Sequence, residues 1–150
     1  MSYQLALADL IRDRFLTAPT ATELATPLDL TGLDVIVDRQ KNILSEVTKA
    51  VAKARGTAVV ILWEGFTTVD KNSARPRLAH SYNITVWSKP ILAGANLAAD
   101  DVMESLIARL WHWKPTGGHA FSEAEVRNGG LVPDSKFLKY DLEVLIPISH

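Results

Sequence analysis

The sequence predicts an α+β fold, in which helices pack on one face of a mostly antiparallel sheet that contains a long β-hairpin. Two long apolar strand segments flank a polar, basic segment near the middle of the chain, at 57–87. Apolar residues at helical spacing precede and follow this hairpin, and a strongly alternating segment lies near the C-terminus. With 150 residues, 47% of them hydrophobic and 22% charged, the chain fits a single domain covering 1–150.

The chain before the hairpin is predicted to form a helix, a short strand and a second helix. Apolar residues at near-helical spacing indicate the first helix, from about Ser2 to Phe15. The threonine- and proline-rich segment 17–32 is typical of a loop or an extended arm. Alternation at 33–37 indicates the strand, and Asp38 can cap a second helix that ends at Gly56.

The hairpin is predicted to consist of strands 57–66 and 77–87, joined by the polar segment 67–76. Both faces of the first strand are apolar at its start, so we expect that strand to be central or covered on both sides. The return strand alternates, which indicates one face turned to water or to a partner. His80 lies on its inward side, where we expect a hydrogen-bonded core or interface histidine.

The third helix is predicted to run from about Leu97 to Trp113, because Pro115 and the glycines beyond it stop a helix. Its apolar stripe consists of Val102, Leu106, Ile107 and Leu110. Trp111 is expected to continue this buried stripe, and Trp113 is expected to be a packing or interface anchor.

Two strands are predicted after the third helix. Segment 120–134 indicates a weak strand broken at Gly129–Gly130. Segment 136–148 alternates strongly between apolar and charged residues and indicates the closing strand of the sheet. Pro147 is expected to end that strand, because proline cannot donate to the ladder of hydrogen bonds.

No pattern in the chain predicts catalysis, a metal site or a cofactor. The chain has no cysteine, which excludes disulfides and thiolate zinc sites. The four histidines lack the spacing that places two ligands on one helical face. Neither a phosphate-binding loop, a dinucleotide fingerprint nor a nucleophile elbow is present. The sequence therefore predicts a protein that is not an enzyme and that takes no cofactor.

The charge distribution bears on partners rather than on chemistry. The net charge is −1, with a basic middle and acidic ends, which suits head-to-tail contacts between copies or is surface charge without a role. A near-neutral chain is not typical of a dedicated nucleic-acid binder. The N-terminus lacks the pattern of a signal peptide, and no apolar run is long enough for a membrane span. We therefore expect a cytoplasmic product.

Three segments in this order resemble the tail terminator family of tailed bacteriophages and prophages, both lambda-like and Mu-like. The segments are the hairpin VVILWEGF…RPRLAHSYNITVWS, the helix AADDVMESLIARLWHW and the closing strand KFLKYDLEVLIPI. The resemblance covers most of the chain and contains no short diagnostic motif. It implies a hexameric ring that caps the tail tube, stops its polymerisation and docks to the head-tail connector or neck.

The resemblance also implies partners and locations. They are copies of the same chain, the tail tube protein and the neck, with DNA passing through the ring lumen and no membrane. The protein would be in the host cytoplasm during assembly and then in the virion. The hypothetical interface residues are Asp70, Lys71, Arg75, Arg77 and Trp113. Two alternatives stay open: a small dimeric α+β module that binds a ligand or protein, and a head-completion or neck protein.

Overall fold

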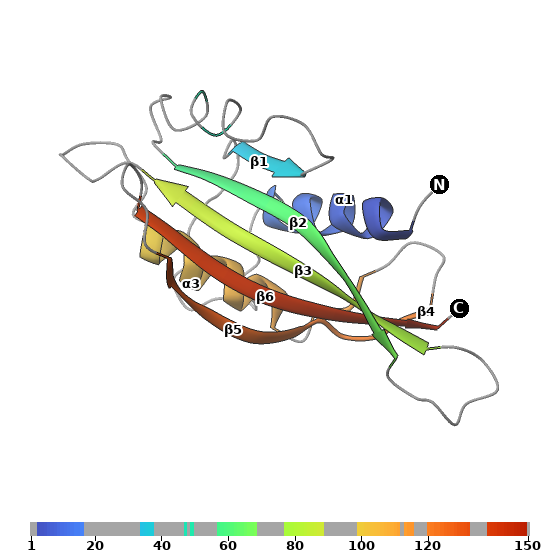
Figure 1. Ribbon diagram of the computed structural model, residues 1–150. Coiled ribbons are helices and arrows are strands. Elements are labelled where there is room, and N and C mark those ends of the chain that lie inside the picture. The colour runs from blue at the N-terminus through green and yellow to red at the C-terminus, as the bar shows by residue number, and fades with distance from the viewer. Residues whose placement is uncertain are drawn as a thin grey trace.

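The computed structural model describes residues 3–16, 34–37, 47, 49, 57–68, 77–88, 99–111, 113–115, 120–132 and 138–149. In chain order (Figure 1), its elements are α1 (Tyr3–Leu16), β1 (Asp34–Val37), β2 (Thr57–Thr68), β3 (Arg77–Ser88), α3 (Ala99–Leu110), β4 (Ala120–Phe121), β5 (Glu125–Val132) and β6 (Leu138–Ser149). The predicted arm at 17–32, most of the predicted second helix and the hairpin segment 69–76 lie outside the described residues.

The described strands form one sheet in the order β1-β2-β3-β6-β4, and β5 also pairs with β6. β1 runs parallel to β2. Every other pairing in the described sheet is antiparallel. β2 and β3 form the long hairpin, which pairs from Thr57–Ser88 to Thr68–Leu78. The predicted α+β class, the mostly antiparallel sheet and its long hairpin are confirmed.

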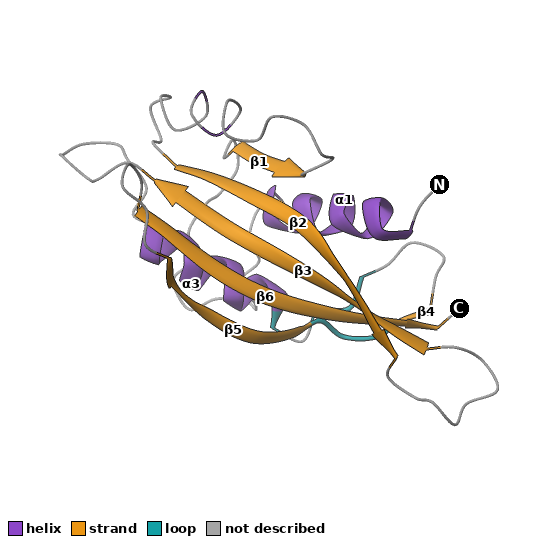
Figure 2. Ribbon diagram, in the orientation of Figure 1, coloured by secondary structure: helices purple, strands orange, loops and turns teal. Residues whose placement is uncertain are grey.

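Both α1 and α3 lie on the same side of the sheet, where they cover the main core (Figure 2). Alternate residues of β2, β3 and β6 point toward these helices, as the period of two in the sequence predicts. The helices contribute residues spaced three or four apart, such as Leu7, Ile11 and Phe15 of α1. Strand residues with no exposed surface in this core include Ile61, Ile84 and Val144.

The opposite face of the sheet has a smaller apolar cluster at the start of β2. Val47 is helical and buried, and it packs with Ala58 and Val60. Ile36 and Trp87 are partly buried against the same cluster. The start of β2 is therefore covered on both faces, which confirms the prediction made from its two apolar faces.

The end of α3 differs from the prediction. α3 ends at Leu110, and Trp111 is 61% exposed, so the expectation that Trp111 continues the buried stripe is wrong. The amide of Trp113 donates to the carbonyl oxygen of Leu110 at 3.1 Å, which is the tight turn that often ends a helix. Trp113 packs against the core, as expected of a packing anchor.

Two expectations about the last strands are also wrong. Gly129–Gly130 lies inside β5 rather than breaking it, and β6 continues through Pro147 to Ser149. The carbonyl oxygen of Pro147 accepts a hydrogen bond from the amide of Ser122 at 2.8 Å. The nitrogen and the carbonyl group of a strand residue face the same neighbouring strand, so the nitrogen of Pro147 faces Ser122 and not β3. The lack of an N–H on Pro147 therefore removes no hydrogen bond between β6 and β3.

Candidate interaction surfaces

The distal half of β2, Leu62–Thr68, forms an open edge of the sheet. β1 pairs only with Ala58–Ile61 of β2. β3 continues to pair on the other side of β2 as far as Thr68. Among the described residues, no strand pairs with the outer edge of Leu62–Thr68 (Figure 1). Leu62 and Phe66 on this segment are 41% and 57% exposed. Unpaired backbone groups beside exposed apolar side chains form a template for a strand of another chain.

A β-bulge sets the direction of Phe66. The pairing of β2 with β3 shifts between Trp63 and Gly65, and Gly65 has a φ of +134°. In a regular strand, Trp63 and Phe66 would point to opposite faces, because they are three residues apart. The bulge adds one residue and brings both side chains to the ring of His80.

Replacing Gly65 with alanine is expected to destabilise the fold by about 1–2 kcal/mol, because residues with a side chain rarely adopt this φ. No atom lies within 4 Å of the added Cβ, so the cost comes from the backbone alone. Denaturant unfolding measures the loss. Gly130→Ala is the matched control, since its Cβ also meets no atom and its φ is not positive. Equal stability of the two variants would contradict this account of the bulge.

His80 supports Phe66 from the core side. It is 4% exposed, and its Nδ1 accepts a hydrogen bond from Nε1 of Trp63 at 3.2 Å. The ring of His80 lies 6.3 Å from that of Trp63 and 6.3 Å from that of Phe66. The prediction of a hydrogen-bonded, buried His80 is confirmed. The contact with a buried ring restricts Phe66 while leaving more than half of its surface exposed.

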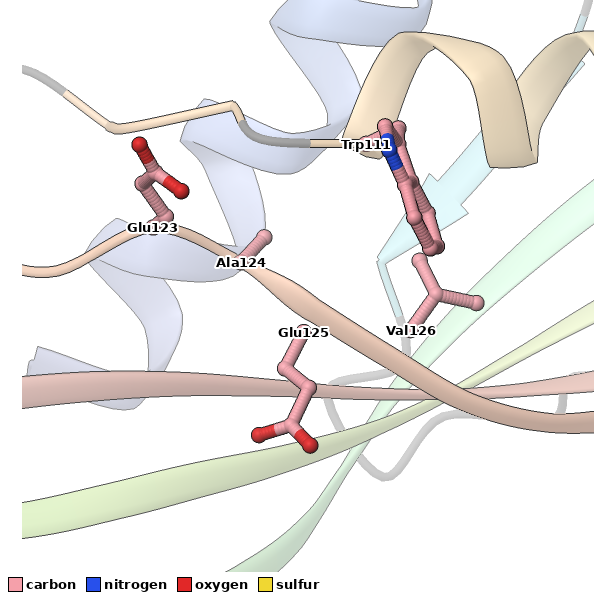
Figure 3. Close-up of a pocket in the computed structure, with 5 residues that line it drawn as sticks. All are labelled: Trp111, Glu123, Ala124, Glu125 and Val126. Carbon is pink, nitrogen blue, oxygen red and sulfur yellow. The ribbon is translucent and has the colours of Figure 1, made fainter.

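The opposite edge of the sheet is β5, and a pocket lies where it begins. The pocket has a volume of about 370 Å³ and is lined by Trp111, Glu123, Ala124, Glu125 and Val126. Figure 3 shows the indole of Trp111 beside Val126, with Ala124 on the same side of the chain and Glu125 projecting to the other side. The amide of Ala124 donates to the carbonyl oxygen of Trp113 at 2.7 Å, which ties β5 to the end of α3.

The face of the sheet opposite α1 and α3 carries three carboxylates beyond the Val47 cluster. Asn128 donates from Nδ2 to Oε2 of Glu143 at 3.1 Å. Thr85 donates from Oγ1 to Oδ1 of Asp141 at 3.2 Å. Desolvation, together with the charges of Glu143 and Asp141, raises the pKa of Glu64 above its ordinary value of 4.5. None of the ion pairs between described side chains involves these three carboxylates.

Glu64→Gln is expected to stabilise the protein at pH 7, by less than about 1 kcal/mol because Glu64 is exposed. The folded state binds a proton at Glu64 more tightly than the unfolded chain does, so ionised Glu64 opposes folding. This penalty is complete above the raised pKa and disappears as the pH falls toward and below 4.5. Thermal unfolding of both proteins between pH 4 and pH 7 measures it. A variant that is less stable than the natural chain at pH 7 would contradict the expected sign.

The structure tests only part of the predicted set of interface residues. Asp70, Lys71 and Arg75 lie outside the described residues. Arg77 begins β3, and its side chain is likewise not described. Trp113 packs against the core, and its backbone carbonyl accepts the hydrogen bond from the amide of Ala124. It does not line the pocket at Trp111. The core against which Trp113 packs includes residues of both hairpin strands, such as Ile61 and Ile84.

Sequence reasoning missed Phe66 and Trp111 as surface residues. The sequence Trp-Glu-Gly-Phe did contain a signal, because two aromatic residues three apart around a glycine conflict with a period of two. A bulge resolves that conflict. Trp111 did carry a signal, because it lies seven residues after the exposed Glu104 and therefore on the same face of the helix. Its amide still donates to the carbonyl oxygen of Ile107 at 3.0 Å, so the helical spacing holds as far as Trp111.

The sequence matches no protein-family model and no curated protein. Among the described residues, no group of histidine, aspartate and glutamate side chains could hold a metal ion. None of the helices in the described part of the chain is both long enough and apolar enough to cross a membrane.

Proposed function

We propose that this chain is the subunit of a tail terminator ring. Copies of the chain would close into a ring that caps a phage tail tube and stops its growth. The observation that carries the proposal is a pair of sheet edges that no described strand covers, the distal half of β2 and the outer side of β5. These edges lie on opposite sides of one subunit and differ in chemistry. A contact between two different surfaces is heterologous, and heterologous contacts that close by rotation form rings.

The order of elements gives the proposal its particular form. The long hairpin, the helix α3 and the closing strand β6 follow one another as in the family that the sequence resembles. That resemblance supports a ring of six copies with the tail tube protein on one side and the neck on the other. DNA would pass through the ring. The subunit would act in the host cytoplasm during assembly and then in the virion, by binding rather than by catalysis.

Tail-tube polymerisation tests the function. Tube protein from the same phage or prophage is allowed to polymerise with and without this chain, and tube lengths are measured by electron microscopy. We expect shorter tubes that end in a ring at one end. Tubes of unchanged length, with no density added to their ends, would count against a terminator.

A dimeric binding module is the second candidate, and the open edge of β2 also favours it. Two copies of Leu62–Thr68 could pair with each other across a twofold axis, which makes an isologous dimer. This arrangement leaves β5 and the pocket at Trp111 unused. The number of chains in the assembly separates the two candidates, since an isologous contact stops at two copies and a ring requires more.

A further inference from the structure

We propose that Phe66 of one copy inserts into the pocket at Trp111 of the next copy. This inference rests on the proposed ring, and it names the side chains that meet at each contact between subunits. The occupant is therefore a second copy of the same chain. Phe66 lies on the edge formed by β2, and the pocket lies on the edge formed by β5.

The register of the sheet places the two features at the same height along the strands. One row of partners runs from Trp63 on β2 through Tyr82 and Val144 to Val126 on β5. Phe66 belongs to the next row, in which its partner His80 pairs with Ile146. Ala124 precedes Val126 by two residues and so reaches the same level as that row. If copies are related by rotation about an axis parallel to the strands, the β2 edge of one copy meets the β5 edge of the next copy with no shift along the strands. Phe66 of the first copy then lies level with the pocket of the second.

The two features also lie on the same face of the sheet. Trp63 packs against the core that α1 and α3 cover. Because of the bulge, Phe66 points to the same face as Trp63, and both rings lie beside His80. Ala124 and Val126 pack against the same core. Trp111 follows α3, which lies on this side of the sheet (Figures 2 and 3). In a ring of copies related by rotation, Phe66 therefore approaches the next copy on the side where its pocket opens.

The chemistry of the two features is complementary. Phe66 is 57% exposed and Trp111 is 61% exposed, so two large aromatic side chains face solvent in the single chain. Aromatic residues buried in pockets at interfaces carry much of the binding energy. Glu123 lines the pocket, whereas Glu125 projects to the other side of the chain and pairs with Arg127 at 3.5 Å. The segment 67–77 that follows Phe66 contains one acidic residue, Asp70, and three basic residues, Lys71, Arg75 and Arg77. The negative charge of Glu123 and the net positive charge of that segment favour the hairpin of a second copy as the occupant.

Disulfide trapping between two variants tests the contact, because the natural chain has no cysteine. Phe66→Cys chains and Trp111→Cys chains, which carry tags of different mass, are mixed and oxidised mildly. We expect a mixed disulfide in the mixture and no disulfide dimer from either variant alone. Leu131→Cys is the matched control, because Leu131 is 62% exposed on β5 but pairs with Tyr140, several rows away. It should not cross-link to Phe66→Cys.

Alanine variants provide a second measurement that needs no thiol. Phe66→Ala and Trp111→Ala should each weaken self-association by roughly tenfold or more while the chain stays folded, and Leu131→Ala should not. Rings that form with equal affinity in all three variants would overturn the inference and leave the ring intact. A disulfide between two Phe66→Cys chains would overturn it in favour of a twofold contact. A natural chain that forms no ring would overturn the proposed function together with this inference.

Discussion

Replacing Arg109 with alanine is expected to lower the free energy of unfolding by about 3 kcal/mol, as for other large buried side chains. Arg109 is 1% exposed and is among the largest side chains that are fully buried. It lies in the last turn of α3, and Arg14 lies in the last turn of α1. Nε of Arg14 donates to the carbonyl oxygen of Arg109 at 3.0 Å, and Nη1 of Arg109 donates to the carbonyl oxygen of Arg14 at 3.5 Å.

This reciprocal contact joins the C-terminal ends of the two helices. The last carbonyl groups of a helix have no partner within it and lie at the negative end of its dipole. A guanidinium group from the other helix donates a hydrogen bond to such a carbonyl group and places a positive charge at the negative end of the dipole. Truncation of Arg109 removes this donor and leaves a cavity between the helices and the sheet, so both losses act in the same direction.

Arg109→Met separates packing from hydrogen bonding. Methionine retains much of the apolar stem of Arg109 but has no donor, so we expect a loss of only about 1 kcal/mol. Guanidinium unfolding followed by tryptophan fluorescence measures all three proteins. An alanine variant as stable as the natural chain would contradict the account. A methionine variant that is as unstable as the alanine variant would assign the effect to the hydrogen bonds alone.

Replacing Leu62 with lysine is expected to abolish self-association and leave a folded monomer. Leu62 is 41% exposed on the open edge of β2. A lysine on such an edge prevents the addition of a strand, because pairing would bury its charge beside the neighbouring backbone. The stability of the monomer should change by less than about 0.5 kcal/mol, as is usual for exposed positions. Light scattering reports the mass, and circular dichroism reports the fold.

Glu104→Gln is the control for the charge change. Glu104 is exposed on α3, so this substitution also adds one unit of positive charge but leaves β2 untouched. It should assemble as the natural chain does. If Leu62→Lys still formed rings, the edge of β2 would not be the contact, and the proposal would lose the observation that carries it.

The sequence was sufficient to predict the fold because burial of apolar side chains determines both the periodicity of the sequence and the faces of its strands and helices. Tyr82, Ile84 and Val86 alternate with polar residues, and the sheet buries those three against the helices. β5 was harder, because Gly129–Gly130 has no side chains that reveal a face. Pairing with β6 forms this strand, and pairing depends on a partner distant in the sequence.

The candidate surfaces were harder to predict because each depends on contacts between distant segments. Arg109 is charged, so its residue type indicates an exposed position, yet it is 1% exposed beside Leu106 and Leu110 and contacts Arg14 of α1. The direction of Phe66 depends on a bulge between β2 and β3, which a period of two does not predict. The sequence predicted contacts at the charged tip of the hairpin. The candidate contact residues in the structure, Leu62 and Phe66, lie instead on β2, the strand that precedes the tip.

The molar mass of the natural chain in solution tests the central claim most directly. Size-exclusion chromatography with light scattering, over a range of protein concentrations, reports the number of chains in each species. The account predicts one main species with the mass of six chains, and its loss in Leu62→Lys. A chain that remains a monomer, or that stops at a dimer, would contradict the ring.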